Sequence, residues 1–280
     1  MDKTVTYTNH LGESVELGPG SHAHITDTEL HSRSWEWDER NGELVGVRRP
    51  AREVTLEFGL AGGGLAERDR IADVMEADTV AGVDGSLQVN GWSLACRAMA
   101  SEKDAWWFDD DLMHDSVTLV SADPVWIRDV EHHFSTLAED EGGEADLGDI
   151  YPRPYPHGYW SPASRDGAVE NGSVAASGFL WRVFGPCTSP TALIGGTQRS
   201  CSVVLASGDR LEVDTRAKTA VTVSSSGIVT NVFDRLSNGV RGSGSYAFEP
   251  LPPGRSEVSW SGGFSFDVVV HEERGEPSWS

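Results

Sequence analysis

The sequence GDRLEVDT at residues 208–215, with LPPG at 251–254 and FSFDVVV at 264–270, decides the fold of the second half of the chain. Alternation of apolar and polar residues is typical of β-strands with one buried face. Gly, Pro and Ser separate these segments and mark turns. Strands are expected near 178–184, 190–195, 200–206, 209–215, 219–224, 228–233, 244–248, 256–261 and 264–271. Their spacing of about ten residues predicts a β-sandwich or a jelly roll.

The first half is also rich in β-structure. REVTLEF at 52–58 alternates cleanly and places Val54, Leu56 and Phe58 on one face. SRSWEWD at 32–38 alternates polar and aromatic residues, as a half-buried strand does. Asn90-Gly91 is a turn signal between two strands. Strands are expected at 5–9, 32–38, 52–58, 85–92, 94–99 and 115–120.

One helix interrupts this pattern, over about residues 65–77. Its apolar side chains, Leu65, Ile71, Ala72, Val74 and Met75, gather on one side, with acids and arginines opposite. The glycines at 62–64 mark a break in the backbone, because the segment lacks the Lys-Ser/Thr ending of a phosphate-binding loop. The first half is therefore predicted to be a β-barrel or sandwich-like domain with one α-helix.

Charge divides the chain near residue 150. Residues 1–150 carry 32 Asp and Glu against 11 Lys and Arg, whereas residues 151–280 carry 12 against 11. YPRPYP at 151–156 predicts an extended segment between the two halves. The predicted organisation is an N-terminal domain at 1–150, a Tyr/Pro-rich hinge at 151–170 and a C-terminal sandwich at 171–280.

Composition argues against several classes of protein. The net charge of −22 would repel phosphate backbones, so nucleic-acid binding is disfavoured. No apolar run approaches the roughly 20 residues that span a bilayer, and the N-terminus lacks a secretory signal. The protein is thus expected to fold in a cytoplasm, without a membrane. Three widely spaced cysteines, Cys96, Cys187 and Cys201, are expected to be buried free thiols.

The titratable residues form no convincing catalytic or metal-binding pattern. The acids at 109–111 lack the alternating order of a calcium loop, and pairing one with Glu102 as an acid/base couple is unspecific. His22 and His24 share a strand face but have no third ligand nearby. The adjacent residues at 132–133 would point to opposite faces of a strand. We therefore expect a protein that is not an enzyme and that has no metal or cofactor.

The tryptophans give the main alternative. In a sugar-binding sandwich, aromatics such as Tyr159, Trp160, Trp181 and Trp260 could stack on pyranose rings, which would make the chain a carbohydrate-binding module of a cell-surface or cell-wall system. The same residues could instead contact a protein partner. We favour a core role for Trp181 and Trp260, because buried aromatics dominate the energetics of sandwiches.

The order of these parts resembles the distal tail protein family of long-tailed, non-contractile phages, whose members join the tail tube to the host-binding tip. The resemblance rests on the helix after a strand and a Gly break, and on the segments VTLVSADPVW at 117–126 and YPRPYP at 151–156. It continues in GPCTSP at 185–190, GDRLEVDT at 208–215 and LPPGRSEV at 251–258, where Ser256 replaces a more usual Asn.

This resemblance implies a galectin-like sandwich in the C-terminal half and a hexameric ring closed by the N-terminal domains. It implies a structural virion protein of the tail tip, assembled in the host cytoplasm, with the tail tube, tape-measure and receptor-binding proteins as partners. A ring with head-to-tail contacts suits a tube adaptor. An acidic lumen would let DNA pass without binding it.

Overall fold

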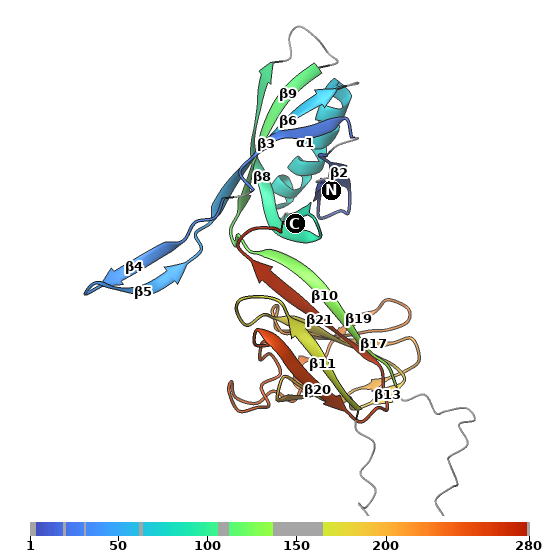
Figure 1. Ribbon diagram of the computed structural model, residues 1–280. Coiled ribbons are helices and arrows are strands. Elements are labelled where there is room, and N and C mark those ends of the chain that lie inside the picture. The colour runs from blue at the N-terminus through green and yellow to red at the C-terminus, as the bar shows by residue number, and fades with distance from the viewer. Residues whose placement is uncertain are drawn as a thin grey trace, which may run out of the picture. The chain divides into compact units, whose positions relative to one another are not determined.

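The computed structural model describes residues 4–18, 21–30, 32–61, 64–105, 112–136 and 165–278. The predicted mainly-β fold class is confirmed, with one α-helix among these residues (Figure 1). The chain divides into two compact units, the first formed by Met1–Arg128 with Glu273–Ser280 and the second by Asp129–Glu272. Most of the predicted hinge lies outside the described residues, and its last residues open strand β11 (Arg165–Asn171).

Unit 1 is built from antiparallel strands that pair in the order β2-β1-β7-β8-β9-β6-β3. The long strand β8 pairs with β7 along its first half and with β9 along its second half. The bounds are β1 (Val5–Thr8), β2 (Ser14–Glu16), β3 (Ala23–Thr28), β6 (Arg52–Ala61), β7 (Gly85–Val89), β8 (Trp92–Ala105) and β9 (Leu112–Ser121). Val54, Leu56 and Phe58 are buried on one face of β6, as predicted.

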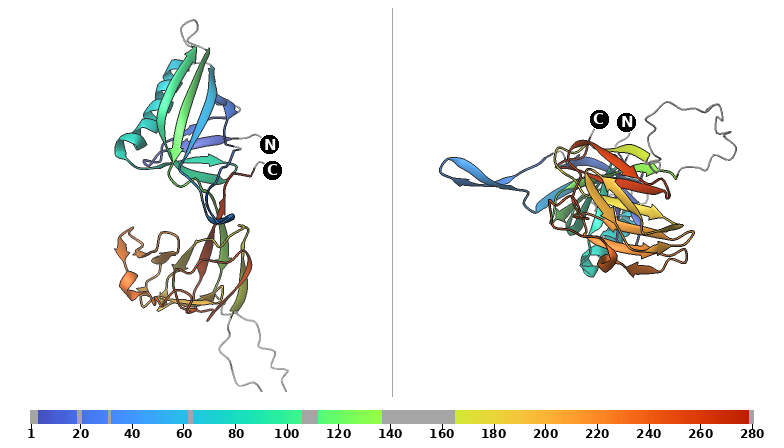
Figure 2. Two further views of the ribbon diagram at one scale, coloured as in Figure 1. Left: turned by 90° about the vertical axis from the view of Figure 1, so that its left-hand side faces the viewer. Right: turned by 90° about the horizontal axis from the view of Figure 1, so that it is seen from below.

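The helix α1 (Gly64–Ala81) lies along these strands and contacts β8, β6 and β2 (Figure 2, left). Ile71, Val74 and Met75 are buried as predicted, whereas Ala72 is half-buried and Leu65, in the first helical turn, is 38% exposed. The helix runs past the predicted end and stops at Gly82, whose φ of +69° is the left-handed conformation of a C-terminal cap.

Unit 1 also contains a hairpin of β4 (Glu36–Arg40) and β5 (Glu43–Arg48), which projects from the other strands (Figure 1). Asn41 and Gly42 form its turn, both with positive φ, as a tight two-residue hairpin requires. The pair forms its own two-stranded sheet. Asn-Gly at 41–42 is the sequence signal for this hairpin. A strand was predicted at 32–38, and this two-residue turn explains why β5 follows β4 so closely.

Unit 2 is a sandwich of two main sheets. One has the strand order β19-β18-β17-β12-β21-β10 and the other β11-β20-β14-β15, with a small β13-β16 pair beside them. The remaining bounds are β10 (Trp126–Phe134), β12 (Phe179–Phe184), β13 (Cys187–Thr188), β14 (Thr191–Ile194), β15 (Thr197–Ser200), β16 (Val204–Leu205), β17 (Arg210–Asp214), β18 (Thr219–Val223), β19 (Val229–Asn231), β20 (Gly254–Trp260) and β21 (Phe266–Arg274).

A single core joins the two sheets of unit 2. It includes Val213 and Val268 from the first sheet and Ile194 and Val258 from the second. Strand β10 belongs to this unit from Asp129 onward and was not expected, because Glu131 and the neighbouring histidines weaken its apolar pattern. The predicted strand at 200–206 is interrupted, since only residues 204–205 and the end of β15 are extended.

The predicted strand at 244–248 is wrong, because this segment forms turns around a buried arginine. Arg199 is 1% exposed and donates from its guanidinium to the carbonyls of Ala247 at 3.3 Å and Glu249 at 2.7 Å. It also donates to Ile194 at 2.6 Å and Thr197 at 3.1 Å. Burial lowers its pKa to about 10. The guanidinium of one side chain thus donates hydrogen bonds to backbone carbonyl groups that would otherwise need the N–H groups of a neighbouring strand.

Replacing Arg199 with Lys should lower the free energy of unfolding by about 2–4 kcal/mol, because one ammonium cannot satisfy four carbonyls in a buried site. Urea denaturation at a fixed protein concentration measures the change. Arg241→Lys, at an exposed position of the same unit, is the matched control and should change stability by less than about 0.5 kcal/mol. Equal stability of the two variants would contradict this role for Arg199.

Candidate assembly surface

The β4–β5 hairpin carries a group of large apolar side chains that the described residues of the chain leave exposed. Trp37 is 63% exposed and Val47 59% exposed, although these two residues lie directly opposite each other in the pairing of the hairpin. The full set of exposed apolar residues is Trp35, Trp37, Leu44, Val45 and Val47. Contiguous exposed apolar groups of this kind mark interaction surfaces.

The hairpin has two unlike faces. Trp37 and Val47 share one face, and Trp35, two residues before Trp37, continues it under the guanidinium of Arg49 at 4.8 Å. The other face holds the ion pair between Arg48 and Glu36, with 2.8 Å between Nε and Oε2. We call the first face, formed by Trp35, Trp37 and Val47, the apolar hairpin face.

The prediction of a half-buried strand at 32–38 is wrong for the chain taken alone, because every residue of β4 is exposed. The alternation that suggested burial is real, but no part of the described chain covers it. An isolated two-stranded hairpin is marginally stable in water, so a covering surface would stabilise it. The sequence pattern is therefore that of a face suited to burial, which the described residues leave open.

The base of the hairpin is fixed to unit 1 by polar contacts. Arg52, the first residue of β6, donates to the carbonyl of Glu29 at 2.5 Å and to the hydroxyl of Ser32 at 2.7 Å. These bonds join the segment that enters the hairpin to the strand that leaves it. The hairpin therefore starts from a defined position on unit 1.

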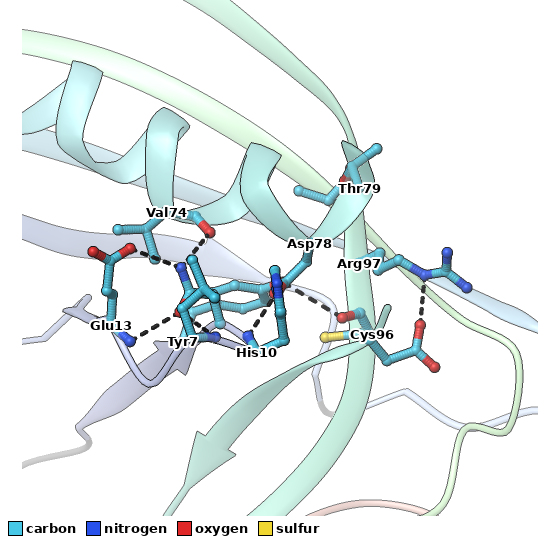
Figure 3. A network of polar contacts seen from close by, with 12 residues as sticks. Tyr7, His10, Glu13, Val74, Asp78, Thr79, Cys96 and Arg97 are labelled. Carbon is cyan, nitrogen blue, oxygen red and sulfur yellow. Dashed lines mark hydrogen bonds and ion pairs between the residues drawn. The ribbon is translucent and has the colours of Figure 1, made fainter. Parts of the chain in front are cut away.

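A buried carboxylate lies elsewhere in unit 1, where the turn between β1 and β2 meets α1 (Figure 3). Asp78 is fully buried and accepts hydrogen bonds from the Tyr7 hydroxyl at 2.6 Å and the His10 backbone N–H at 2.8 Å. Nδ1 of His10 also lies 2.6 Å from Asp78 Oδ1. Asn9 adds a bond to the carbonyl of Val74 at 3.3 Å. Together these bonds fix the turn to the helix.

The pKa values in this cluster follow from burial and hydrogen bonding. Burial raises the pKa of the Asp78 carboxyl, but the bonds from His10 and Tyr7 outweigh it and hold that pKa below its usual value. Burial and the Asp78 carboxylate both raise the pKa of Tyr7. Burial also raises the pKa of the adjacent Cys96 to about 12, which leaves its thiol a poor nucleophile. The cluster thus has bound polar atoms and no activated nucleophile.

Two cavities, one in each unit, are lined in part by polar or titratable side chains. One of about 420 Å³ between α1 and β8–β9 contains Asp115, whose pKa burial raises. Its carboxylate is held by Arg68 at 3.1 Å and by the Ser116 N–H at 2.9 Å. The other, of about 600 Å³ in unit 2, is lined by hydroxyl, amide and apolar groups, with Cys187 as its one titratable residue. Glu76 is the second carboxyl group that lines the first cavity, whereas the second cavity has no Asp, Glu or His in its lining.

The residues singled out from the sequence are scattered. Trp181 and Trp260 are buried in the core of unit 2, where Trp181 packs edge-on against Phe266 and the Trp260 indole N–H donates to the carbonyl of Phe264 at 3.1 Å. Trp181 is fully buried, whereas Trp260 is 6% exposed and also lines the cavity of about 600 Å³ in unit 2. The other two candidate aromatics, Tyr159 and Trp160, and the acids at 109–111 lie outside the described residues.

The two histidine pairs of the sequence lie in different units of the chain. His22 and His24 are exposed on either side of the buried Ala23, and His133 forms an ion-pair contact with Asp267 at 2.6 Å. Within the described ranges, no three His, Cys, Asp or Glu residues are grouped so that they could hold a metal ion. No helix in that part of the chain is long and apolar enough to cross a membrane. The three cysteines are free.

No protein-family model matches the chain, and no curated protein matches its sequence. Solved structures do share its fold. The Dit protein of phage SPP1, described as a paradigm of the hub adsorption apparatus in Gram-positive infecting phages, is similar with a TM-score of 0.59 and 14% identity, over 97% of this chain and 99% of that one.

Two structures of the phage P2 baseplate in its activated conformation give the same result. The one with Ca has a TM-score of 0.59 at 11% identity, over 99% of this chain and 100% of that one. The one with Sr has a TM-score of 0.56 at 11% identity, over 98% of both chains. The resemblance to the distal tail protein family is therefore confirmed at the level of the fold and along nearly the whole chain.

Replacing Gly85 with Ala should destabilise unit 1 by about 2–4 kcal/mol, because the added Cβ would lie 2.1 Å from an Asp78 oxygen and 2.5 Å from the Tyr7 hydroxyl. Gly275→Ala is the control in the same unit, since its Cβ would come no closer than 3.7 Å to any other atom considered, a carbon of Arg33. Thermal or urea unfolding compares the two, and an unchanged Gly85→Ala would contradict the packing described.

Asp78→Asn should lower the free energy of unfolding by about 1–3 kcal/mol at pH 7. Because the folded pKa of Asp78 lies below its unfolded value, the carboxylate stabilises the fold above about pH 4, and this contribution is lost as the pH falls through the folded pKa. The difference between wild type and variant should therefore shrink at pH 3. The exposed Asp73→Asn on the same helix is the control. A difference that stays constant with pH would count against the network.

Proposed function

We propose that the protein is a structural component of a phage tail tip, a distal tail hub that forms a ring between the tail tube and the host-adsorption apparatus. The observation that carries this proposal is the apolar hairpin face, an exposed surface on a chain whose fold matches hub and baseplate proteins along nearly its full length. The chain needs no catalytic site for this role.

The geometry of the hairpin favours a cyclic assembly. The hairpin is an arm on one side of unit 1, and in a ring of more than two copies its apolar face meets a different surface on the next copy, which is a head-to-tail contact. Head-to-tail contacts close into rings when the rotation between copies divides a full turn. The family resemblance supports six copies.

The proposed partners follow from the position of such a ring in a tail. The tail tube and tape-measure proteins would lie on one side and the receptor-binding proteins on the other, at the tip of the virion, after assembly in the host cytoplasm. The excess of acids in residues 1–150 suits a channel through which DNA passes without binding. Acids that face only outward in an assembled ring would overturn this part of the proposal.

The ring is tested by combining negative-stain imaging with light scattering after size exclusion. Wild type should give a six-fold ring with a central hole, and the double variant Trp37→Ser with Val47→Ser should give smaller species. Because both side chains are exposed in the isolated chain, the variant should keep its unfolding free energy per chain within about 1 kcal/mol.

The control changes the opposite face of the same hairpin, with Glu36→Ser and Arg48→Ser. These residues form an exposed ion pair of little energetic value, so the ring should persist. A wild type that is monomeric at micromolar concentration would refute the proposed ring. A ring that survives the Trp37/Val47 variant would refute the role of the apolar hairpin face.

A further inference from the structure

A second candidate contact surface lies in unit 2, at the edge of its first sheet. Strand β19 is the last strand of that sheet and pairs only with β18, with Val221, Thr222 and Val223 opposite Asn231, Thr230 and Val229. All three residues of β19 are exposed. An edge strand presents unpaired backbone N–H and C=O groups to its surroundings.

The hydrogen bonds on either side of β19 show which backbone groups point outward. The N–H of Ser224 donates to the carbonyl of Ile228 at 3.0 Å, and the N–H of Val232 donates to the carbonyl of Ala220 at 2.9 Å. Antiparallel bonds recur at every second residue, so Thr230 faces β18. The N–H and C=O groups of Val229 and Asn231 consequently face away, and no other backbone partner binds them within the described ranges.

This edge lacks the devices that usually prevent strand pairing. Residues 219–233 contain no ionisable side chain and no proline, although the chain as a whole carries a net charge of −22. Ile228 is 65% exposed and Val229 is 62% exposed. Natural edge strands are generally protected by charges, especially Lys, or by Pro. The segment is therefore a place where a second acidic molecule can approach without like-charge repulsion.

The outward groups are also self-complementary. They lie symmetrically on either side of Thr230, so two copies related by a two-fold axis can pair antiparallel with Val229 of one opposite Asn231 of the other. Each such pair exchanges two hydrogen bonds, which gives four in all. Thr230 then meets its own counterpart, a cross-strand Thr pair of the kind that stabilises sheets.

We infer that β19 is a contact surface for a second copy of this chain, which extends the first sheet of unit 2 across a two-fold axis in a register centred on Thr230. This contact is distinct from the head-to-tail contact of the apolar hairpin face. It joins like surfaces, so it doubles a ring built by the hairpin when its two-fold axis is perpendicular to the axis of that ring.

Site-directed crosslinking tests the register. Thr230→Cys would place two cysteines at a non-hydrogen-bonded antiparallel pair, with Cα atoms about 4.5 Å apart, within the range of about 4.4–6.8 Å for disulfides. Under mild oxidation the variant should form a covalent dimer. Val174→Cys, at a 95% exposed position elsewhere in unit 2, gives the yield of crosslinked dimer from random collision. Wild type gives the yield from the native cysteines. A Thr230→Cys yield no higher than that of Val174→Cys overturns the proposal.

A proline variant tests the association itself. Val229→Pro removes one outward N–H and leaves the bonds of Thr230 to β18, so the fold should be kept, whereas Val229→Thr keeps the outward N–H. By mass photometry or sedimentation at micromolar concentration, wild type and Val229→Thr should have twice the mass of Val229→Pro. Equal masses for all three would overturn the proposal. Should Val229→Pro fail to fold, the crosslink alone decides.

The doubling separates this inference from the proposed function. If the hairpin builds a ring, Val229→Pro should leave a single ring where wild type gives a double one. If it builds none, the same variant should leave a monomer where wild type gives a dimer. A doubled mass without rings would refute the ring and support the β19 contact. Single rings in wild type would support the ring and refute the β19 contact.

Discussion

An apolar face on a two-stranded ribbon is the constraint on which the rest of this protein depends. Trp35, Trp37 and Val47 point from a hairpin that has no third strand and no helix over it in the described chain. Burial of such side chains contributes roughly 1.5–3 kcal/mol each, and the isolated chain gains little of this. A cover from outside the described residues would therefore stabilise the hairpin, whose base is bonded to unit 1 through Arg52.

Two buried charged groups with well-satisfied polar atoms each fix an irregular segment, one in unit 1 and one in unit 2. Asp78 binds the β1–β2 turn to α1, and Arg199 holds an irregular segment of unit 2 by its carbonyl oxygens. Burying a charge is costly unless it is fully hydrogen-bonded, so each of these residues fixes one conformation of the loop around it. Two separate cores, one in each unit, supply the apolar burial.

Much of this fold could be predicted from the sequence, because period-two alternation in β6, β12 and β17 and the apolar stripe of α1 are local signals. Strand β10 could not, since its burial comes from neighbours distant in sequence. The segment 244–248 was predicted to be a strand and is not one. The carbonyl groups of Ala247 and, just after the segment, Glu249 bind the guanidinium of Arg199, a contact between residues distant in sequence that the local pattern does not show. At the hairpin, alternation in 32–38 predicted a buried face, whereas every residue of β4 is exposed in the described chain. A pattern within one chain cannot specify whether another molecule covers such a face.

Hydrogen–deuterium exchange of the backbone amides in 36–48 tests the central claim most directly. In the assembled protein, the hairpin amides should exchange slowly, because a neighbouring copy covers the apolar hairpin face, and they should exchange quickly in the dissociated Trp37/Val47 double variant. The amides of β6 should be protected in both. Rapid exchange across 36–48 in the assembled wild type would show that nothing covers the hairpin, and it would contradict this account.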